Sequence, residues 1–289
     1  MNQKTYFLGD THTLDILDRL ISNIPDEKNY TIVHVGDCGE GFASQKAERN
    51  ILRELYKYLD DRASKVSVCR GNHSDPQYFS PNHWANQEFK KCIEFVQDYT
   101  IMDINGLTYQ FIGGAISIDR TSRTKNVTWW ENEIFVEKPE LATKVDVLVT
   151  HTAPHFCHPV EFSKIVYDWA QDDSTLLSEL SHERQMVTNI FNICQPKLHV
   201  YGHFHQYGNS EMINGCKHRQ LGIDEFWTPF AYSDVLSNQL EEYLALYSQL
   251  KKMENHNNEE SDKLRDKMDP IYYSLTPCEL AKLKNLTNE

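Results

Sequence analysis

The sequence predicts an α/β fold in which short strands alternate with helices. Five apolar, β-rich runs each end abruptly in glycine or a polar residue, as strands do when they deliver polar side chains to the edge of a sheet. The runs are TYFLGDTH, TIVHVGDCGE, KVSVCRGNH, VDVLVTHTAP and KLHVYGHFH. Segments 14–24 and 47–59, which lie between the first three runs, have helical patterning. This alternation is what an α/β fold requires.

The remaining segments extend this pattern toward the C-terminus. The run YQFIGGAISIDR predicts a further strand and a glycine-rich turn, and we expect the following segment NVTWWENEIF to form a loop beside the site. Between residues 235 and 253, apolar side chains recur at helical spacing and predict an amphipathic helix that covers the core. The polar residues 254–267 indicate a solvated connection or an exposed helix end. We therefore expect a catalytic domain over residues 1–234 and a helical C-terminal appendage over residues 235–289 that packs on it.

The composition restricts the kinds of partner that the chain can bind but does not identify its function. The chain has 289 residues, of which 40% are hydrophobic and 25% are charged, and both values are ordinary for a globular protein. A net charge of −13 argues against a broad basic surface for nucleic acid, and we find no strong Lys and Arg cluster of the kind that a nuclease groove needs. Bound cations would still attract a phosphorylated substrate.

Cysteine usage and hydropathy indicate a protein of the cytoplasm. The seven cysteines are irregularly spaced and include no CxxC pair, so we expect reduced structural thiols. The opening MNQKTYFLGD does not resemble a signal peptide, and no run approaches the length of a membrane span. We expect a cytoplasmic protein without a membrane partner.

Polar residues at the strand ends suggest where chemistry takes place. In open α/β sheets, ligands bind outside the carboxyl ends of the strands. Each motif is weak alone, because an HxH triplet often arises by chance and a single Asp usually caps a turn. Together, however, the motifs supply Asp, Asn and His in a fixed order, each after a predicted strand. They are Gly9-Asp10-Thr11-His12, Gly36-Asp37, Gly71-Asn72-His73, His151 and Gly202-His203-Phe204-His205.

This ordered set resembles the signature of the calcineurin-like metallophosphoesterases, which reads DxH, GDxx(D/E), GNH, a single His and GHxH. The resemblance spans roughly residues 5–206. It implies a sandwich of two mixed β-sheets flanked by helices, with a dinuclear metal centre at the strand ends. The implied ligands are Asp10, His12 and His205 for one metal, Asn72, His151 and His203 for the other, and Asp37 as the bridge between them.

The resemblance also implies cofactors and a mechanism. Mixed carboxylate, amide and imidazole ligands suit divalent Mn, Fe or Zn, so we expect two such ions. The implied reaction is in-line attack of a metal-bridging hydroxide on a phosphate ester. His73 follows a ligand and is implied to protonate the leaving alkoxide or to stabilise the phosphoryl group. Glu40 could orient His73 and raise its basicity, or it could cap the following turn or helix.

One departure from the family pattern concerns the substrate. Protein Ser/Thr phosphatases of this superfamily usually read GDxxDRG, where the arginine clamps phosphate, but this chain has Gly41 at that position. The glycine favours a phosphodiesterase or a nucleotide-type phosphatase. Arg120 and Arg123, in the run SIDRTSR, are candidates to supply a guanidinium from another loop. The alternative is that they form surface ion pairs with nearby acidic residues such as Glu131 or Glu133.

Several other aromatic and histidine side chains are candidates of lower rank. Alternation along an extended segment would bury one of Trp129 and Trp130, and the exposed one could stack on a planar leaving group. His155 and His158 follow His151 closely, and sequence proximity is the only argument for them. His34 lies inside a predicted strand and is expected to be a buried structural residue.

We therefore expect a metal-dependent phosphoesterase, with manganese among the expected ions, that hydrolyses a small or nucleotide-like phosphomonoester or phosphodiester. The alternatives are a Ser/Thr protein phosphatase and a non-catalytic protein-binding scaffold of the same fold. The intact set of ligands favours an enzyme over a scaffold. The sequence leaves open the leaving group, the choice between monoester and diester, the resident metal and the oligomeric state.

Overall fold

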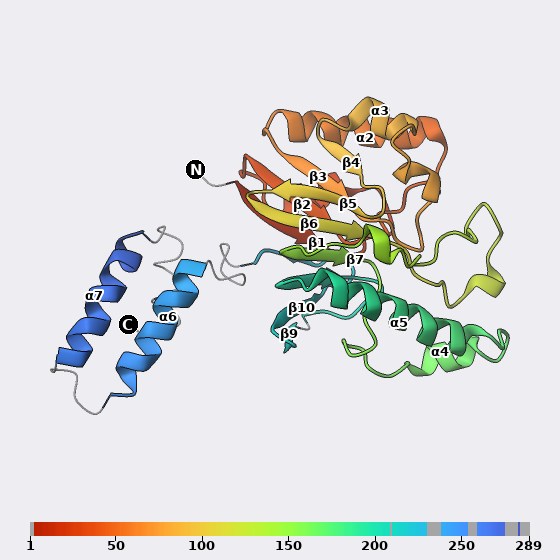
Figure 1. Ribbon diagram of the computed structural model, residues 1–289. Helices are drawn as coiled ribbons and strands as arrows, with labels where there is room; N and C mark the ends of the chain where they lie inside the picture. Colours follow the sequence, from red (N-terminus) through yellow and green to blue (C-terminus); the bar gives the residue numbers. More distant parts are fainter. Residues whose placement is uncertain (1–2, 209, 230–237, 254–258, 275–282, 284–289) are drawn as a thin grey trace. The chain divides into compact units, whose positions relative to one another are not determined.

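Two mixed β-sheets with helices on their outer faces form residues 3–227 of the computed structural model (Figure 1). The structure describes residues 3–208, 210–229, 238–253, 259–274 and 283. The first sheet has the strand order β11-β1-β2-β3-β4, and only β11 is antiparallel to its neighbour. Its strands are β1 (Lys4–Leu8), β2 (Tyr30–His34), β3 (Lys65–Val68), β4 (Ile93–Phe95) and β11 (Phe226–Trp227).

The second sheet has the strand order β5-β6-β7-β8-β10-β9. Its four central strands are parallel, and the two edge strands are antiparallel to their neighbours. The strands are β5 (Thr100–Ile104), β6 (Leu107–Ile112), β7 (Val147–Thr150), β8 (Leu198–Tyr201), β9 (Ser210–Ile213) and β10 (Cys216–Gln220). The rings of Phe7 on β1 and Tyr109 on β6 stack at a centroid distance of 6.4 Å, so the two sheets meet through aromatic side chains.

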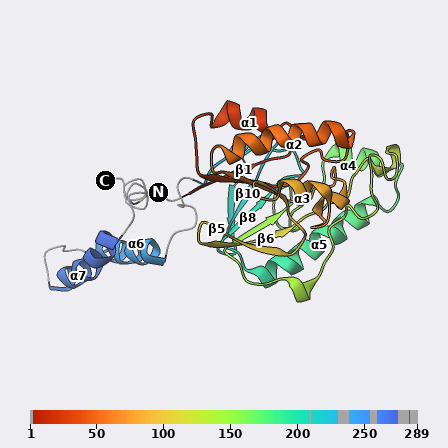
Figure 2. The same ribbon diagram turned by 90° about the horizontal axis from the view of Figure 1, so that it is seen from above.

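Helices cover the outer faces of the two sheets. Figure 2 shows α1 and α2 on one side of the sheets and α5 on the other. Leu20, Leu52 and Leu55 of α1 and α2 belong to one buried cluster with Ile32 of β2. Phe191 of α5 belongs to a second cluster that includes residues of β6 and β7. The helices are α1 (Ile16–Asn23), α2 (Gln45–Asp60), α3 (Trp84–Phe89), α4 (Lys164–Trp169) and α5 (Leu176–Cys194), with short 3-10 turns at Pro76–Phe79, Arg120–Ser122 and Pro139–Leu141.

The predicted fold class is confirmed. The five runs with polar ends form β1, β2, β3, β7 and β8, and the two predicted helices are α1 and α2. The run YQFIGG forms β6 and its following turn, and residues 126–135 form a loop apart from one isolated bridge between Lys125 and Trp129. Strands β4, β5, β9, β10 and β11 and helices α3 to α5 were not predicted, and for the edge strands the reason is that short edge strands carry a weak hydrophobic pattern.

The C-terminal region forms a compact unit of its own. The chain divides into residues 1–227 and residues 228–289, and the expected boundary after residue 234 falls among residues that the structure does not describe. Within the second unit, α6 (Asn238–Lys251) and α7 (Glu259–Ser274) lie side by side, and the rings of Tyr243 and Tyr272 are 5.9 Å apart. The polar residues from 259 to 267 are therefore helical. Packing of this unit on the first one stays a prediction.

None of the helices in the described parts of the chain combines the length and the apolar character that a membrane span needs.

One buried arginine ties the ends of the two sheets together. The Arg70 side chain, 5% exposed, donates from Nη2 to Oδ2 of Asp98 at 2.7 Å. The same guanidinium donates to the carbonyl oxygens of Gly113, Asn132, Glu133 and Ile134. Arg70 follows β3 and Gly113 follows β6, so these bonds join the carboxyl end of each sheet to the loop that contains residues 132–134.

Replacement of Arg70 should strongly destabilise the fold. Arg70→Met removes the donor to Oδ2 of Asp98 and to several carbonyls, and removal of one partner of a buried ion pair costs about 3–5 kcal/mol. The control is Lys4→Met, which breaks the exposed pair with Glu27 and should change the free energy of unfolding by less than about 1 kcal/mol. Urea denaturation measures both. Equal effects of the two substitutions would contradict the assigned role of Arg70.

Candidate metal centre

All seven predicted metal ligands lie together at the carboxyl ends of five strands. Because these strands run parallel to their neighbours within each sheet, their ends meet at one edge of the sandwich. Asp10 and His12 follow β1, Asp37 follows β2, Asn72 follows β3, His151 follows β7, and His203 and His205 follow β8. Residues separated by almost the whole length of the domain thus form one cluster.

Four of these residues form a first group around two carboxylates. One ligand atom each from Asp10, His12, Asp37 and His205 lies within 4.8 Å of all the others. Nε2 of His12 is 3.0 Å from Nε2 of His205, which is 3.4 Å from Oδ2 of Asp10. Two imidazole nitrogens and a carboxylate oxygen that point at one another form a ligand set for a divalent cation.

The other three residues form a second group, which Asp37 joins to the first. Oδ1 of Asn72 is 2.9 Å from Nε2 of His151 and 2.9 Å from Nδ1 of His203. Nε2 of His151 is also 3.3 Å from Oδ1 of Asp37. Asp37 therefore contacts both groups, which is the position that a bridging carboxylate requires.

Hydrogen bonds outside the two groups orient the ligands. Nδ2 of Asn72 donates to Oγ of Ser117 at 3.0 Å, which turns Oδ1 of Asn72 toward the histidines. Nδ1 of His151 is 3.0 Å from the carbonyl oxygen of Val35, which turns Nε2 toward the site. Such outer partners fix the orientation and the tautomer of metal ligands. Ser117 lies beyond the glycine-rich turn, and no sequence signal pointed to it.

The glycines of the motifs make room for the ligands. A Cβ atom on Gly202 would lie 2.1 Å from Oδ1 of Asp10, and one on Gly36 would lie 2.3 Å from Nδ1 of His151. No real side chain tolerates such distances, so only glycine fits at these two positions. The backbone is also held in the left-handed region at four ligands, and strain of this kind concentrates at functional sites. The residues are His12, Asp37, His203 and His205, with φ values of 53°, 54°, 67° and 54°.

The buried charges at this site fit two cations. Oδ1 of Asp10 and Oδ2 of Asp37 are buried, and neither has a hydrogen-bond partner among the described residues. Burial raises the pKa of Asp10. Burial alone would lower the pKa of His151, but the carboxylates of Asp37 and Asp10 outweigh it and raise that pKa to about 9. A proton on His151 thus compensates charge that a divalent ion would otherwise neutralise, and the oxygen and imidazole donors match Mn, Fe or Zn.

His73 and Arg123 lie beside the metal ligands. Nη1 of Arg123 is 2.9 Å from Nδ1 of His73, and Nη2 is 2.7 Å from Nε2. The backbone amide of His73 donates to Oδ1 of Asp37 at 2.7 Å. Burial, with further contributions from Arg123 and His12, outweighs the Asp37 and Asp119 carboxylates and lowers the pKa of His73 to about 4. His73 is therefore a neutral imidazole at pH 7.

The structure separates the two candidate arginines. Arg123 lines the cavity at the metal ligands and pairs with Asp119 at 2.7 Å. Arg120 instead pairs with Asp173 at 2.6 Å and with Glu179 at 2.5 Å. Arg120 is not among the residues that line the cavity, so the structure does not bring it to the site. Its ion pairs are with residues at the start of α5, not with the neighbouring Glu131 or Glu133.

The expected contact between Glu40 and His73 is absent. Glu40 is fully buried, and no hydrogen bond joins its carboxyl group to His73. Burial raises the pKa of Glu40 to about 8, so the carboxyl group is mostly protonated at pH 7. An uncharged carboxyl group that does not contact the imidazole cannot raise its basicity. The carboxylate expected to orient His73 is thus replaced by the Arg123 guanidinium.

The remaining histidine and tryptophan candidates lie outside the ligand set. His34 is fully buried and 3.2 Å from the hydroxyl of Thr11, as expected of a structural residue. His155 contacts Thr188 and His158 contacts Gln206, each through a ring nitrogen. Trp130 is 6% exposed, as expected for one of the pair, but Trp129 is half-buried and not exposed. Neither tryptophan lines the cavity at the site.

A cavity of about 490 Å³ opens from the metal ligands. His12, Asp37, Asn72 and His203 line it, together with His73 and Arg123. Another part of the lining is apolar, and this apolar wall comes from α4, the segment before it and α5. The residues of this apolar wall are Pro159, Phe162, Ile165, Val166, Trp169 and Leu180. No motif pointed to this wall, because most of its residues lie in segments without any of the motifs.

Comparisons with known proteins agree with this architecture. A family model described as calcineurin-like phosphoesterase matches residues 3–207. None of the curated proteins matches the chain significantly.

Three solved structures illustrate how distant the structural neighbours are. One crystal structure is 14% identical, covers 79% of this chain and 95% of its own, and has a TM-score of 0.48. A protein of unknown function from Aquifex aeolicus is 15% identical over 71% of this chain and 81% of its own, with a TM-score of 0.33. A cold-active protein-tyrosine phosphatase of a psychrophilic Shewanella is 15% identical over 75% of this chain and 71% of its own, with a TM-score of 0.32.

The buried Glu40 carboxyl group should make stability fall as pH rises. Its pKa is about 8 in the folded chain and lower when unfolded, so the folded state holds the proton longer and stability is lost between about pH 4.5 and pH 8. Glu40→Gln removes this titration. We measure the melting temperatures of the variant and of wild type after chelator treatment. The difference, variant minus wild type, should increase with pH up to about 8, because only wild type loses stability through this titration. A difference independent of pH would show that Glu40 is ionised in the fold.

Proposed function

The chain belongs to the calcineurin-like phosphoesterase family, and from this premise we propose that it hydrolyses a small or nucleotide-like phosphomonoester or phosphodiester with two divalent cations. The observation that carries the proposal is the position of Asp37. Its carboxylate belongs to the group of Asp10, His12 and His205 and also lies 3.3 Å from Nε2 of His151. An intact bridging position beside a cavity supports catalysis over a non-catalytic scaffold.

The cations follow from the ligand set. When bound, two divalent ions supply acidification of water and neutralisation of charge on the phosphoryl group. We propose Mn, Fe or Zn, with manganese as the first ion to test. The residues that would hold them are Asp10, His12 and His205 on one side, Asn72, His151 and His203 on the other, and Asp37 between them.

Arg123 and His73 are the residues that we propose to contact the phosphoryl group. The planar guanidinium of Arg123 can donate to two phosphate oxygens, and Asp119 holds it in place at 2.7 Å. In this role Arg123 replaces the arginine that protein phosphatases carry at the position of Gly41. His73, held neutral at pH 7, has a ring N–H to donate to the phosphoryl or leaving oxygen.

The apolar wall supports a compact leaving group with a flat or apolar face. The cavity has a volume of about 490 Å³, which lies in the usual range of small-molecule sites, about 300–1,000 Å³. Phe162, Val166 and Trp169 line the same cavity as the candidate metal ligands, and Glu161 and Gln206 add polar groups to it. A nucleoside has this combination of a planar face and polar edges. The wall therefore favours a nucleotide-like substrate over a phosphoprotein, and we retain the cytoplasm as the expected location.

The first experiment tests the reaction and its metal together. The full chain is stripped with a chelator, reloaded separately with Mn, Zn, Fe, Ni or Mg, and assayed with p-nitrophenyl phosphate and with bis-p-nitrophenyl phosphate. We expect turnover that depends on the metal and is abolished in Asp37→Asn, because this substitution removes the shared carboxylate charge. The preferred ester separates a monoesterase from a diesterase. If two ions bind but no phosphate ester, nucleotides included, is hydrolysed, the result would contradict the proposal and favour a non-catalytic scaffold.

The two arginines of the loop after β6 provide a matched pair. Arg123→Met should lower kcat/KM by about 10²–10³-fold, the usual effect of losing one preorganised donor to the transition state. Arg120→Met should leave kcat/KM essentially unchanged, because Arg120 pairs with Asp173 and Glu179 away from the cavity. Metal content should be the same in both variants. Steady-state kinetics with the preferred ester measure kcat/KM for both variants. Equal losses of kcat/KM in the two variants would show that both arginines have only a structural role.

A further inference from the structure

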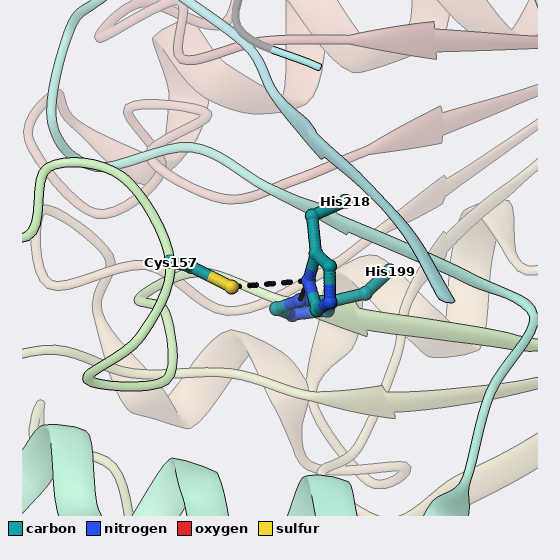
Figure 3. Close-up of side chains that lie close together, drawn as sticks. All are labelled: Cys157, His199 and His218. Carbon is teal, nitrogen blue, oxygen red and sulfur yellow. Dashed lines mark hydrogen bonds between the residues drawn. The ribbon is translucent and has the colours of Figure 1, made fainter. Parts of the chain in front are cut away.

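A second cluster of potential metal ligands lies inside the second sheet, apart from the residues of the metal centre. Cys157 follows β7, His199 lies on β8 and His218 lies on β10. His199 and His218 are direct partners in the parallel pairing of β8 and β10, so their side chains project from the same face. Figure 3 shows that the three side chains point toward one another. All three are buried.

The contacts among the three residues converge on Nδ1 of His218. This nitrogen is 3.0 Å from Sγ of Cys157 and 3.1 Å from Nδ1 of His199. The three candidate ligand atoms lie within 4.8 Å of one another. The arrangement offers one sulfur and two imidazole nitrogens around a common point.

Hydrogen bonding fixes the tautomer of His199. The hydroxyl of Thr150 donates to the carbonyl oxygen of Thr152, so it can only accept from Nε2 of His199, which lies 2.8 Å away. With its proton on Nε2, His199 presents a bare lone pair at Nδ1 toward His218. Orientation of a histidine by an outer hydroxyl or carbonyl is typical of metal sites.

Nδ1 of His218 faces two groups at once. If the Cys157 thiol donates to it, Nδ1 of His218 and Nδ1 of His199 face each other as two lone pairs at 3.1 Å. If His218 carries its ring proton on Nδ1 instead, it can donate to only one of the two groups. One cation between the three atoms would use the sulfur and both Nδ1 lone pairs.

The protein holds the cysteine loop in place independently of any ion. The Arg184 guanidinium donates to the carbonyl oxygens of Pro154, Cys157 and Pro159 at 2.8, 2.6 and 2.5 Å. Arg184 is 5% exposed and comes from α5. The Cys157 thiol is therefore presented by a fixed loop and not by a mobile one. Preorganisation of this kind lowers the cost of closing a metal site.

From these observations we propose that Cys157, His199 and His218 form a further metal site that binds one thiophilic ion, Cu⁺ or Zn²⁺. Mixed thiolate and imidazole ligands select soft and borderline ions over Mn²⁺ or Mg²⁺. On binding, the Cys157 thiol loses its proton to solvent and a metal–sulfur bond forms, with no change in oxidation state. The two histidines need lose no proton, because burial lowers the pKa of His218 to about 4 and that of His199 well below its usual value.

Charge and ligand number favour Cu⁺ as the occupant. The rings of Phe191 and Tyr201 lie 5.9 and 5.1 Å from His199, so the surroundings are largely aromatic and a net charge there is costly. Cu⁺ with one thiolate is neutral, whereas Zn²⁺ leaves one positive charge. Zn²⁺ also prefers a fourth ligand, and the described residues place no fourth His, Cys, Asp or Glu in this group.

X-ray absorption spectroscopy tests the site without relying on activity. The full chain is purified from cells grown with added copper or added zinc, and spectra are recorded at each metal edge. We expect a sulfur ligand at the copper edge, which the oxygen and nitrogen donors of the dinuclear centre cannot provide. A sulfur shell at the zinc edge instead, at about 2.3 Å, would support the same site with zinc as the ion.

Two matched cysteine variants identify the residue that supplies the sulfur ligand. Cys157→Ser should remove the sulfur signal and lower the metal content by one ion per chain. Cys92→Ser, at another buried cysteine whose thiol contacts Asp60 and no histidine, should leave both unchanged. If Cys157→Ser fails to fold by circular dichroism, His218→Gln takes its place with the same expected loss. Absence of a sulfur ligand at both edges in wild type, or its persistence in Cys157→Ser, would overturn the proposal.

Discussion

The burial of two carboxylates, Asp10 and Asp37, at one point is the constraint on which the rest of the site depends. Each carboxylate has one oxygen with no hydrogen-bond partner in the described structure, although both residues are almost completely buried. An isolated carboxylate is costly to bury, so the fold must supply positive charge at this point. His151, with its raised pKa, supplies part of it, and divalent cations are suited to supply the remainder. The cost of burying these carboxylates and the proposed binding of metal are therefore linked.

The local backbone follows from this constraint. Ligands from two sheets can approach one another only if the residues between strand and ligand occupy little space, which explains Gly36 and Gly202 in their motifs. The left-handed backbone at His12, Asp37 and His203 aims side chains at the centre at a conformational cost. The rigid ends of the parallel strands and the buried Arg70 network offset that cost. The strain is thus concentrated where the ligands must converge.

The second sheet contributes more than ligands to the function that we propose. Arg184 lines the substrate cavity and also holds the loop that presents Cys157. The proposed thiophilic site and the proposed catalytic site are therefore built on neighbouring parts of β7, β8 and α5, although they share no ligand. Their donor sets differ in kind, since one has carboxylates and imidazoles and the other has a thiol and two imidazoles. This chemical difference would keep different metals in different places.

The sequence by itself determined the fold class and pointed to the candidate metal ligands that the structure brings together, because the strands and their polar ends are encoded locally. A short apolar run that ends in Gly-Asp or Gly-Asn-His marks a strand and its polar end at the same time, and the parallel arrangement of strands brings those ends together. The tertiary structure alone decided which arginine reaches the cavity, that Glu40 does not contact His73, and where the apolar wall lies. It alone brought Cys157 next to His199 and His218. These features depend on pairings between distant segments and on the desolvation of individual groups. Neither can be predicted from a local pattern of residues.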